Sequence, residues 1–123
     1  MKILHLYAGL GICRGRWGDE HDIIAVEHDE KIAAMYKELW PDTVIVGDAH
    51  SALLEYAGWA DAVWSSPPCP SHSRMIRGGK NRKPRFPDFT LYEEVVWLQH
   101  NFKGAGGWVV ENVRPYYKPL VEP

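Results

Sequence analysis

The chain has 123 residues, of which 46% are hydrophobic and fifteen are aromatic, so it is long enough for one folded domain with a substantial core. Its apolar runs are about the length of a strand, which excludes a membrane span, and its first residues lack the long apolar region of a secretory signal. Two cysteines do not make a disulfide framework, so we expect a cytoplasmic protein in a reducing compartment, with no membrane partner.

Apolar runs predict five strands, at residues 3–7, 22–27, 43–46, 61–66 and 108–113. Helical spacing predicts helices between them: one capped by Asp29 and stopped by Pro41, a short one over 51–56, and a longer one capped by Thr90. His5, inside the first strand, is expected to be a hydrogen-bonded core histidine. The alternation of strands and helices predicts one domain over residues 1–123, an α/β fold with a doubly wound, mostly parallel open sheet.

The net charge of −2 conceals an asymmetry along the chain. Six cations and no acid fall between residues 74 and 85, and the remaining residues carry eight cations against sixteen acids. Glycines and prolines punctuate the basic segment, so it is predicted to be a loop, either a solvated one or one that contacts phosphates. Its place directly after Cys69 favours phosphate contact, because a polyanion would have to lie there to reach the thiol.

Polar residues follow the carboxyl ends of the predicted strands, where an open α/β sheet binds its ligands. They are Tyr7, Glu27, Asp48, Cys69 and Glu111. Cys69 stands beyond an apolar run on a loop stiffened by prolines, which is typical of a displayed nucleophile rather than a core cysteine. If the fourth and fifth strands are parallel neighbours, Glu111 comes to the same rim, and a thiolate beside a proton donor is expected.

The glycine turn after the first strand suggests a cofactor site. Gly9 and Gly11 remove side chains where the backbone would turn around a ligand, and Glu27 follows at the distance of a ribose-binding acid, although Arg14 replaces the third glycine of the dinucleotide pattern. A tight turn without a ligand would look the same, and Asp48 could simply cap the next helix. No metal is expected, because Cys69 and His72 are only half of a zinc motif.

The same residues resemble the motifs of the DNA cytosine-5 methyltransferases. Residues 6–11 look like the family's first motif, Glu27 like its ribose-binding acid, residues 47–48 like its adenine-contacting motif and residues 66–70 like its nucleophile motif, and residues 111–113 are its Glu-Asn-Val. The order and approximate spacing match from residue 3 to residue 115. The chain departs from the family at Pro70, where glutamine is usual, at Tyr7, where phenylalanine is usual, and at Ile12, which replaces a common glycine.

The resemblance implies part of a Rossmann-like methyltransferase fold and the transfer of a methyl group from S-adenosyl-L-methionine to C5 of cytosine in double-stranded DNA, in a prokaryotic or phage-like cytoplasm. It implies catalysis by Cys69 and Glu111. The cofactor contacts that it implies are Tyr7, Ala8, Gly9, Gly11, Glu27, His28, Asp48, Ala49 and Pro67. The implied DNA contacts are Ser73, Arg74, Arg77, Lys80, Arg82, Lys83, Arg85 and Arg114.

The family's target-recognition region and closing helix, which follow Glu-Asn-Val, have no counterpart in these 123 residues. We therefore expect the catalytic half of a methyltransferase, as a cut or truncated chain, one subunit of a split enzyme that needs a second chain, or a remnant. The alternative is a non-catalytic module that binds S-adenosyl-L-methionine or DNA. A thiol hydrolase is disfavoured, because no histidine is placed as the base for Cys69.

Overall fold

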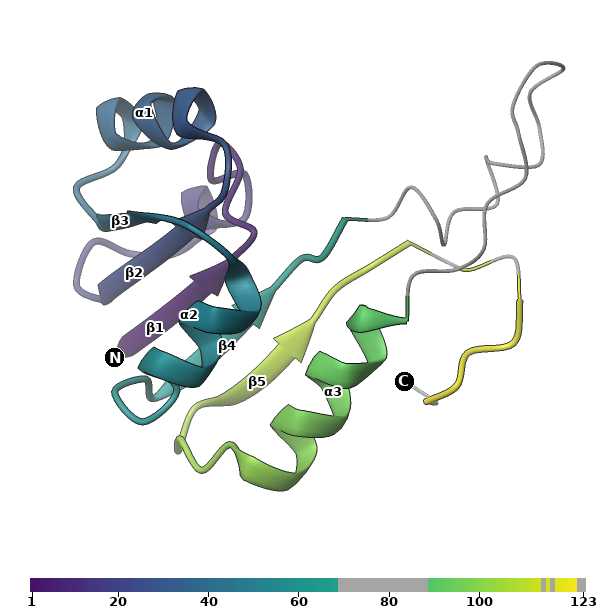
Figure 1. Cartoon of the computed structure of the whole chain (residues 1–123). Coiled ribbons are helices and arrows are strands. Elements are labelled where there is room, and N and C mark those ends of the chain that lie inside the picture. The colour runs from purple at the N-terminus through teal and green to yellow at the C-terminus, as the bar shows by residue number, and fades with distance from the viewer. Residues whose placement is uncertain (69–88, 114, 116, 122–123) are drawn as a thin grey trace, which may run out of the picture.

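The computed structural model describes residues 1–68, 89–113, 115 and 117–121, which form a five-stranded parallel sheet with its helices (Figure 1). The strands are β1 (Lys2–Leu6), β2 (Asp22–Glu27), β3 (Thr43–Val46), β4 (Ala62–Ser65) and β5 (Gly107–Val110). The helices are α1 (Glu30–Leu39), α2 (Ala49–Tyr56), α3 (Thr90–Asn101) and the single 3₁₀ turn η1 (Arg14–Arg16). The predicted α/β class is confirmed, and no helix in the described ranges is long and apolar enough to cross a membrane.

The strands lie in the order β3-β2-β1-β4-β5, and every neighbouring pair is parallel. The chain winds outward from β1 to β2 and β3, and then returns to place β4 on the other side of β1. Leu6, the last residue of β1, pairs with Val26 on one side and with Ser65 on the other. This is the doubly wound sheet that the sequence predicts, with β1 at its centre.

The two faces of the sheet are covered by different helices, because successive side chains of a strand point to opposite faces. One core cluster combines strand residues with α2 and α3 and includes Leu4, Leu6, Val26, Leu53, Val63 and Leu98, all at most 3% exposed. A second cluster joins Ala25 of β2 to Tyr36 of α1, with Trp40 packed against it. The sheet is therefore buried between two layers, which explains why β1 reads as a nearly continuous apolar run.

His5 lies on the α1 face and is 2% exposed. Its ring packs edge-on against Trp17 at 5.0 Å and Tyr36 at 6.4 Å, and its Nδ1 has no hydrogen-bond partner among the described residues. The expectation of a hydrogen-bonded core histidine is therefore wrong for this nitrogen, because aromatic rings surround the imidazole. Burial lowers the pKa of His5 from 6.5 to about 4.

This lowered pKa predicts a loss of stability in mild acid. Unfolded chains take up a proton at position 5 near pH 6.5 and folded ones only near pH 4, so the free energy of unfolding should fall by about 3 kcal/mol as the pH drops from 7.5 to 4. His5→Phe keeps the ring packing and should remove this part of the pH dependence. Urea unfolding of wild type and His5→Phe at several pH values measures the free energy of unfolding. If this free energy falls equally with pH in both proteins, His5 is not the group responsible.

Arg14 anchors the loop after β1, at the position where the dinucleotide pattern has its third glycine. It is 1% exposed, and its Nε and Nη2 donate to the two carboxylate oxygens of Asp42 at 2.7 and 3.1 Å. Nη2 also reaches Asp19 at 2.9 Å, and the guanidinium lies 5.1 Å from the ring centre of Trp40. The Tyr36 hydroxyl donates to Asp42 at 2.6 Å, and burial together with this bond raises the pKa of Tyr36. A buried ion pair thus ties the loop to the start of β3.

Removing one partner of this ion pair should be severe. Arg14→Met leaves the Asp42 carboxylate buried without its cation and is expected to lower the free energy of unfolding by about 3–5 kcal/mol. Arg16→Met changes an exposed arginine of the same turn and should stay within about 0.5 kcal/mol of wild type. Urea unfolding measures both, and equal midpoints for the two variants would show that the pair contributes nothing.

Most element boundaries follow the expected signals. Asp29 caps α1 as predicted, by accepting from the backbone N–H groups of Lys31 and Ile32 at 2.8 and 3.1 Å. The prediction for Thr90 is wrong: it is the first residue of α3, and Phe89 occupies the cap position. Other boundaries shift as well: α2 begins at Ala49, two residues early, and β5 ends at Val110, three residues early. The bounds of β1 and β4 each differ from the predicted ones by a single residue.

Candidate functional site

In the strand order β3-β2-β1-β4-β5, the chain continues from β1 to β2 on one side and from β4 to β5 on the other, so the carboxyl ends of β1 and β4 form the topological switch point, where open α/β sheets have their ligand crevice. Tyr7 follows β1, Glu27 ends β2, Asp48 follows β3 and Glu111 follows β5, so these four predicted residues do lie at strand ends on one rim. Cys69 comes directly after Pro68 and lies outside the described residues. So do the predicted DNA contacts Ser73, Arg74, Arg77, Lys80, Arg82, Lys83, Arg85 and Arg114.

Glu27 holds the glycine turn. Its Oε2 accepts from the backbone N–H of Gly9 at 2.9 Å, and its Oε1 accepts from the N–H of Asp29 at 3.1 Å. The exposed His28 places Nδ1 3.1 Å from the same Oε1. A carboxylate has about four acceptor positions, so these three contacts leave room for one more donor at Oε2. The residue is 7% exposed, and the acid and the turn that the sequence paired are indeed in contact.

The two glycines of the turn have different surroundings. Both have positive φ angles, 55° at Gly9 and 79° at Gly11. A Cβ at Gly9 would meet no atom within 4 Å, whereas a Cβ at Gly11 would collide with the indole nitrogen of Trp40, which donates to the carbonyl of Leu10 at 3.1 Å. Gly11 is therefore required by the fold, and Gly9 leaves open space beside Glu27.

This difference predicts unequal effects of alanine. Gly9→Ala should cost about 1 kcal/mol, the price of a left-handed conformation for a residue with a Cβ. Gly11→Ala should cost about 2–4 kcal/mol, because the clash with Trp40 adds to the same backbone strain. Denaturant unfolding of the two variants compares them directly. Equal losses would mean that Trp40 moves aside freely.

Asp48 acts as the cap of α2, which was the alternative to an adenine contact. Its Oδ2 accepts from the backbone N–H of Ser51 at 2.8 Å and from its hydroxyl at 3.1 Å, and the backbone bond lowers the pKa of Asp48. The side chain stays exposed at the rim, and the next predicted cofactor residue, Ala49, is buried as the first residue of the helix. The cap does not test the predicted contact between Asp48 and adenine, which stays a prediction.

The ends of β4 and β5 lie side by side. The backbone N–H of Glu111 donates to the carbonyl of Ser65 at 2.8 Å, and Asn112 Nδ2 lies 3.4 Å from the carbonyl oxygen of Pro67. Pro67 is buried and Pro68 is exposed, whereas the Glu111 side chain is exposed. The predicted parallel pairing of these strands is confirmed, and Glu111 shares its rim with the residues that lead directly to Cys69.

Glu94 of α3 contacts the ends of β1 and β4 and was missed by the sequence reasoning. The residue is 2% exposed and accepts from the hydroxyls of Tyr7, at 3.1 Å, and of Ser65. His50 Nε2 lies 3.0 Å from the same carboxylate. The signal was present, because Glu94 occupies the apolar stripe of α3 marked by Leu91 and Leu98, three and four residues away.

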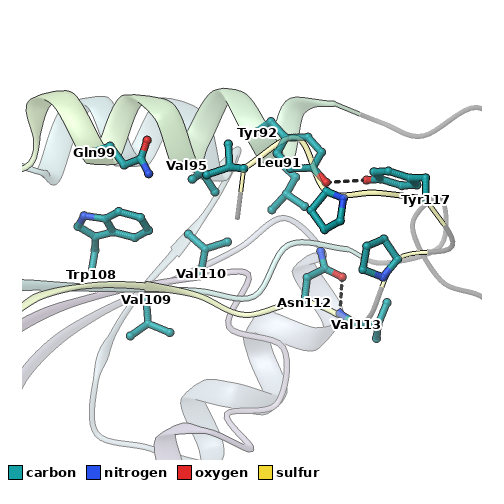
Figure 2. A pocket seen from close by; sticks show the side chains of 13 residues that line it. Leu91, Tyr92, Val95, Gln99, Trp108, Val109, Val110, Asn112, Val113 and Tyr117 are labelled. Carbon is teal, nitrogen blue, oxygen red and sulfur yellow. Dashed lines mark hydrogen bonds between the residues drawn. The ribbon is translucent and has the colours of Figure 1, made fainter. Parts of the chain in front are cut away.

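A groove of 530 Å³ lies between α3 and β5 (Figure 2). Trp108 and Val110 of β5 face Val95 of α3 across it, and the hydroxyls of Tyr92 and Tyr117 meet at 3.0 Å. Because β5 is three strands from β2, roughly 14 Å separates the groove from Glu27. The groove is therefore not the predicted cofactor pocket.

Comparisons with models of protein families and with curated proteins give no match to this chain. The function therefore has to be inferred from the residues that the fold brings to the carboxyl ends of the strands. These are the glycine turn with Glu27, the exits of β4 and β5, and the buried Glu94 between them.

Proposed function

We propose that the chain carries the cofactor-binding and nucleophile elements of a DNA cytosine-5 methyltransferase. The observation that supports this most is the presence, at one rim of the sheet, of a glycine turn held by Glu27 and of the contact between Asn112 and Pro67. The first is suited to an adenosine ligand, and the second brings Glu111 to the segment that leads to Cys69. The motif resemblance given above links both features to one reaction.

The residues at the turn fit S-adenosyl-L-methionine, which would supply the methyl group. Glu27 keeps an acceptor position at Oε2 for a ribose hydroxyl, and the open space at Gly9 lets a ligand approach the backbone closely. Tyr7, Ala8 and Gly11 shape the turn. His28, Asp48, Ala49 and Pro67 stand at the ends of β2, β3 and β4, and their ligand contacts are proposed with it.

The proposed roles of Cys69 and Glu111 follow from the chemistry of cytosine, whose C5 is a weak nucleophile. The Cys69 thiolate forms a bond to C6, which turns C5 into an enamine carbon. Glu111 keeps N3 protonated and so removes the charge that develops on the ring; its exposed side chain is free to approach the base. After C5 is methylated, it loses its proton to a base, and the bond between Sγ and C6 breaks to regenerate the thiolate.

Double-stranded DNA is the proposed substrate. The target base has to leave the stack to reach the thiol, which costs a few kcal/mol. The six cations of residues 74–85 would contact phosphates without regard to sequence. Recognition of a particular site is therefore assigned to a further region or to a second chain.

Two measurements test the proposal. Calorimetry should show S-adenosylhomocysteine binding to the wild type and at least tenfold weaker binding to Glu27→Ala, with Glu30→Gln, an exposed acid in the next helix, as the matched control. Duplex DNA containing 5-fluorocytosine should trap a covalent adduct in the presence of S-adenosyl-L-methionine and, where needed, a chain that supplies the recognition region, because fluorine blocks the final proton loss.

Cys69→Ser should abolish the adduct, and Cys13→Ser should retain it. An adduct that survives in Cys69→Ser overturns the mechanism. Ligand binding without any adduct would instead favour the non-catalytic alternative. Equal S-adenosylhomocysteine binding by the wild type and Glu27→Ala would remove the cofactor assignment itself.

A further inference from the structure

The Glu94 carboxylate lies where β1 and β4 part. Leu6 and Ser65 are the last paired residues of these strands, and beyond them the N–H of Ser66 is 3.5 Å from the carbonyl of Leu6, at the limit of a hydrogen bond. Past this point β1 leads through Tyr7 into the glycine turn, and β4 leads through Ser66 to Pro67 and Pro68. Glu94 joins them through side chains, since it accepts from Tyr7 on one exit and from Ser65 at the end of the other strand.

Tyr7 is strained in the position from which its hydroxyl reaches Glu94. Its φ of 55° makes it the one residue other than glycine with a positive φ in the described part of the chain. This conformation is unfavourable for a bulky side chain and persists only where surrounding contacts hold it. The bond from the Tyr7 hydroxyl to Glu94 is one such contact, and Tyr7 directly precedes the glycine turn.

Stability alone does not account for an acid at this position. The side chain of Glu94 is fully buried, and its neighbours along the helix face are Leu91 and Leu98, three residues before it and four after it. Apolar side chains in place of an entire buried polar cluster are often as stabilising as the cluster, or more so. A charged acceptor, in contrast, can bind three donors from three different elements at once: the β1 exit, β4 and, through His50, α2.

We propose that Glu94 is a positioning residue, which fixes the glycine turn relative to the end of β4. This inference rests on the proposed function: Tyr7 begins the cofactor turn, and Ser65 stands four residues before the proposed nucleophile. By holding both, Glu94 sets the separation between the bound methyl donor and the base that the thiol attacks. It touches neither reactant itself.

The central test compares Glu94→Leu with Glu93→Leu, the same change at the exposed neighbouring acid. Glu93→Leu is expected to keep the wild-type urea midpoint, whereas Glu94→Leu should unfold at a lower urea concentration, because Tyr7, Ser65 and His50 lose their shared acceptor. Glu94→Leu should bind S-adenosylhomocysteine about tenfold more weakly and form the 5-fluorocytosine adduct more slowly still, whereas Glu93→Leu should match wild type in both assays. Glu94→Gln, which keeps one acceptor oxygen, should recover part of the loss. A folded Glu94→Leu with wild-type affinity and adduct rate overturns the proposal.

A second pair of variants keeps the test valid if Glu94→Leu fails to fold. Tyr7→Phe and Ser65→Ala each remove one hydroxyl and leave the carboxylate in place. If both act through Glu94, each should weaken S-adenosylhomocysteine binding, and the double variant should lose less than the product of the two single losses. Strictly multiplicative losses, or no loss in either variant, contradict the proposed link.

Amide hydrogen exchange separates a failure of this inference from a failure of the proposed function, because it needs no ligand. The Gly9 N–H should exchange at least tenfold faster in Tyr7→Phe than in wild type, with no change at Leu4 in the central strand. If wild type binds no S-adenosylhomocysteine but this change is seen, the methyltransferase assignment fails and the positioning role stands. Unchanged exchange at Gly9 removes the positioning role alone.

Discussion

The parallel pairing of β1 with both β2 and β4 is the constraint on which the rest of the molecule depends. Parallel neighbours need long crossover connections, and these put helices on both faces and all carboxyl strand ends on one rim. Because the chain turns back at β1, the ends of β1 and β4 form the topological switch point, where sheets of this kind have their ligand crevice. Residues distant in sequence are thereby brought into contact at this rim, Gly9 with Glu27 and Pro67 with Asn112.

Each face of this sheet holds one buried polar cluster, and the two clusters have different roles. On the α1 face, Arg14 and Asp42 form a bidentate pair with a tyrosine hydroxyl, so both charges are compensated and the loop after β1 is fixed in place. On the α2 and α3 face, Glu94 is held by two hydroxyls and a histidine. The Arg14–Asp42 pair holds the chain just after the glycine turn. The bond from Tyr7 to Glu94 holds the chain just before it. The turn between them is thereby restrained from both sides.

Local signals predicted the fold well because local chemistry decides it. The bounds of β2 and β3 and the Asp29 cap follow from turn residues and apolar runs that lie next to one another in the chain. The Glu94 cluster was not found, because its partners come from other elements, up to 87 residues away in sequence, and the Arg14 pair spans 28 residues. At Asp48 the sequence could not distinguish two roles, because an aspartate is suited both to capping a helix and to contacting a ligand. The bonds from Ser51 in the structure show that it caps α2.

The central place of β1 also has a consequence for the order in which this chain can fold. The pairing of β1 with β4 joins Ile3 to Ala62, so the crevice cannot exist until a loop of about sixty residues has closed. The pairing of β1 with β2 needs a shorter loop, from Lys2 to Asp22, and can form earlier. Contacts of such long sequence separation slow the search for the native state. The crevice is therefore an end product of folding, and its most distant member, Glu94, can reach Tyr7 only when the two halves of the sheet have joined.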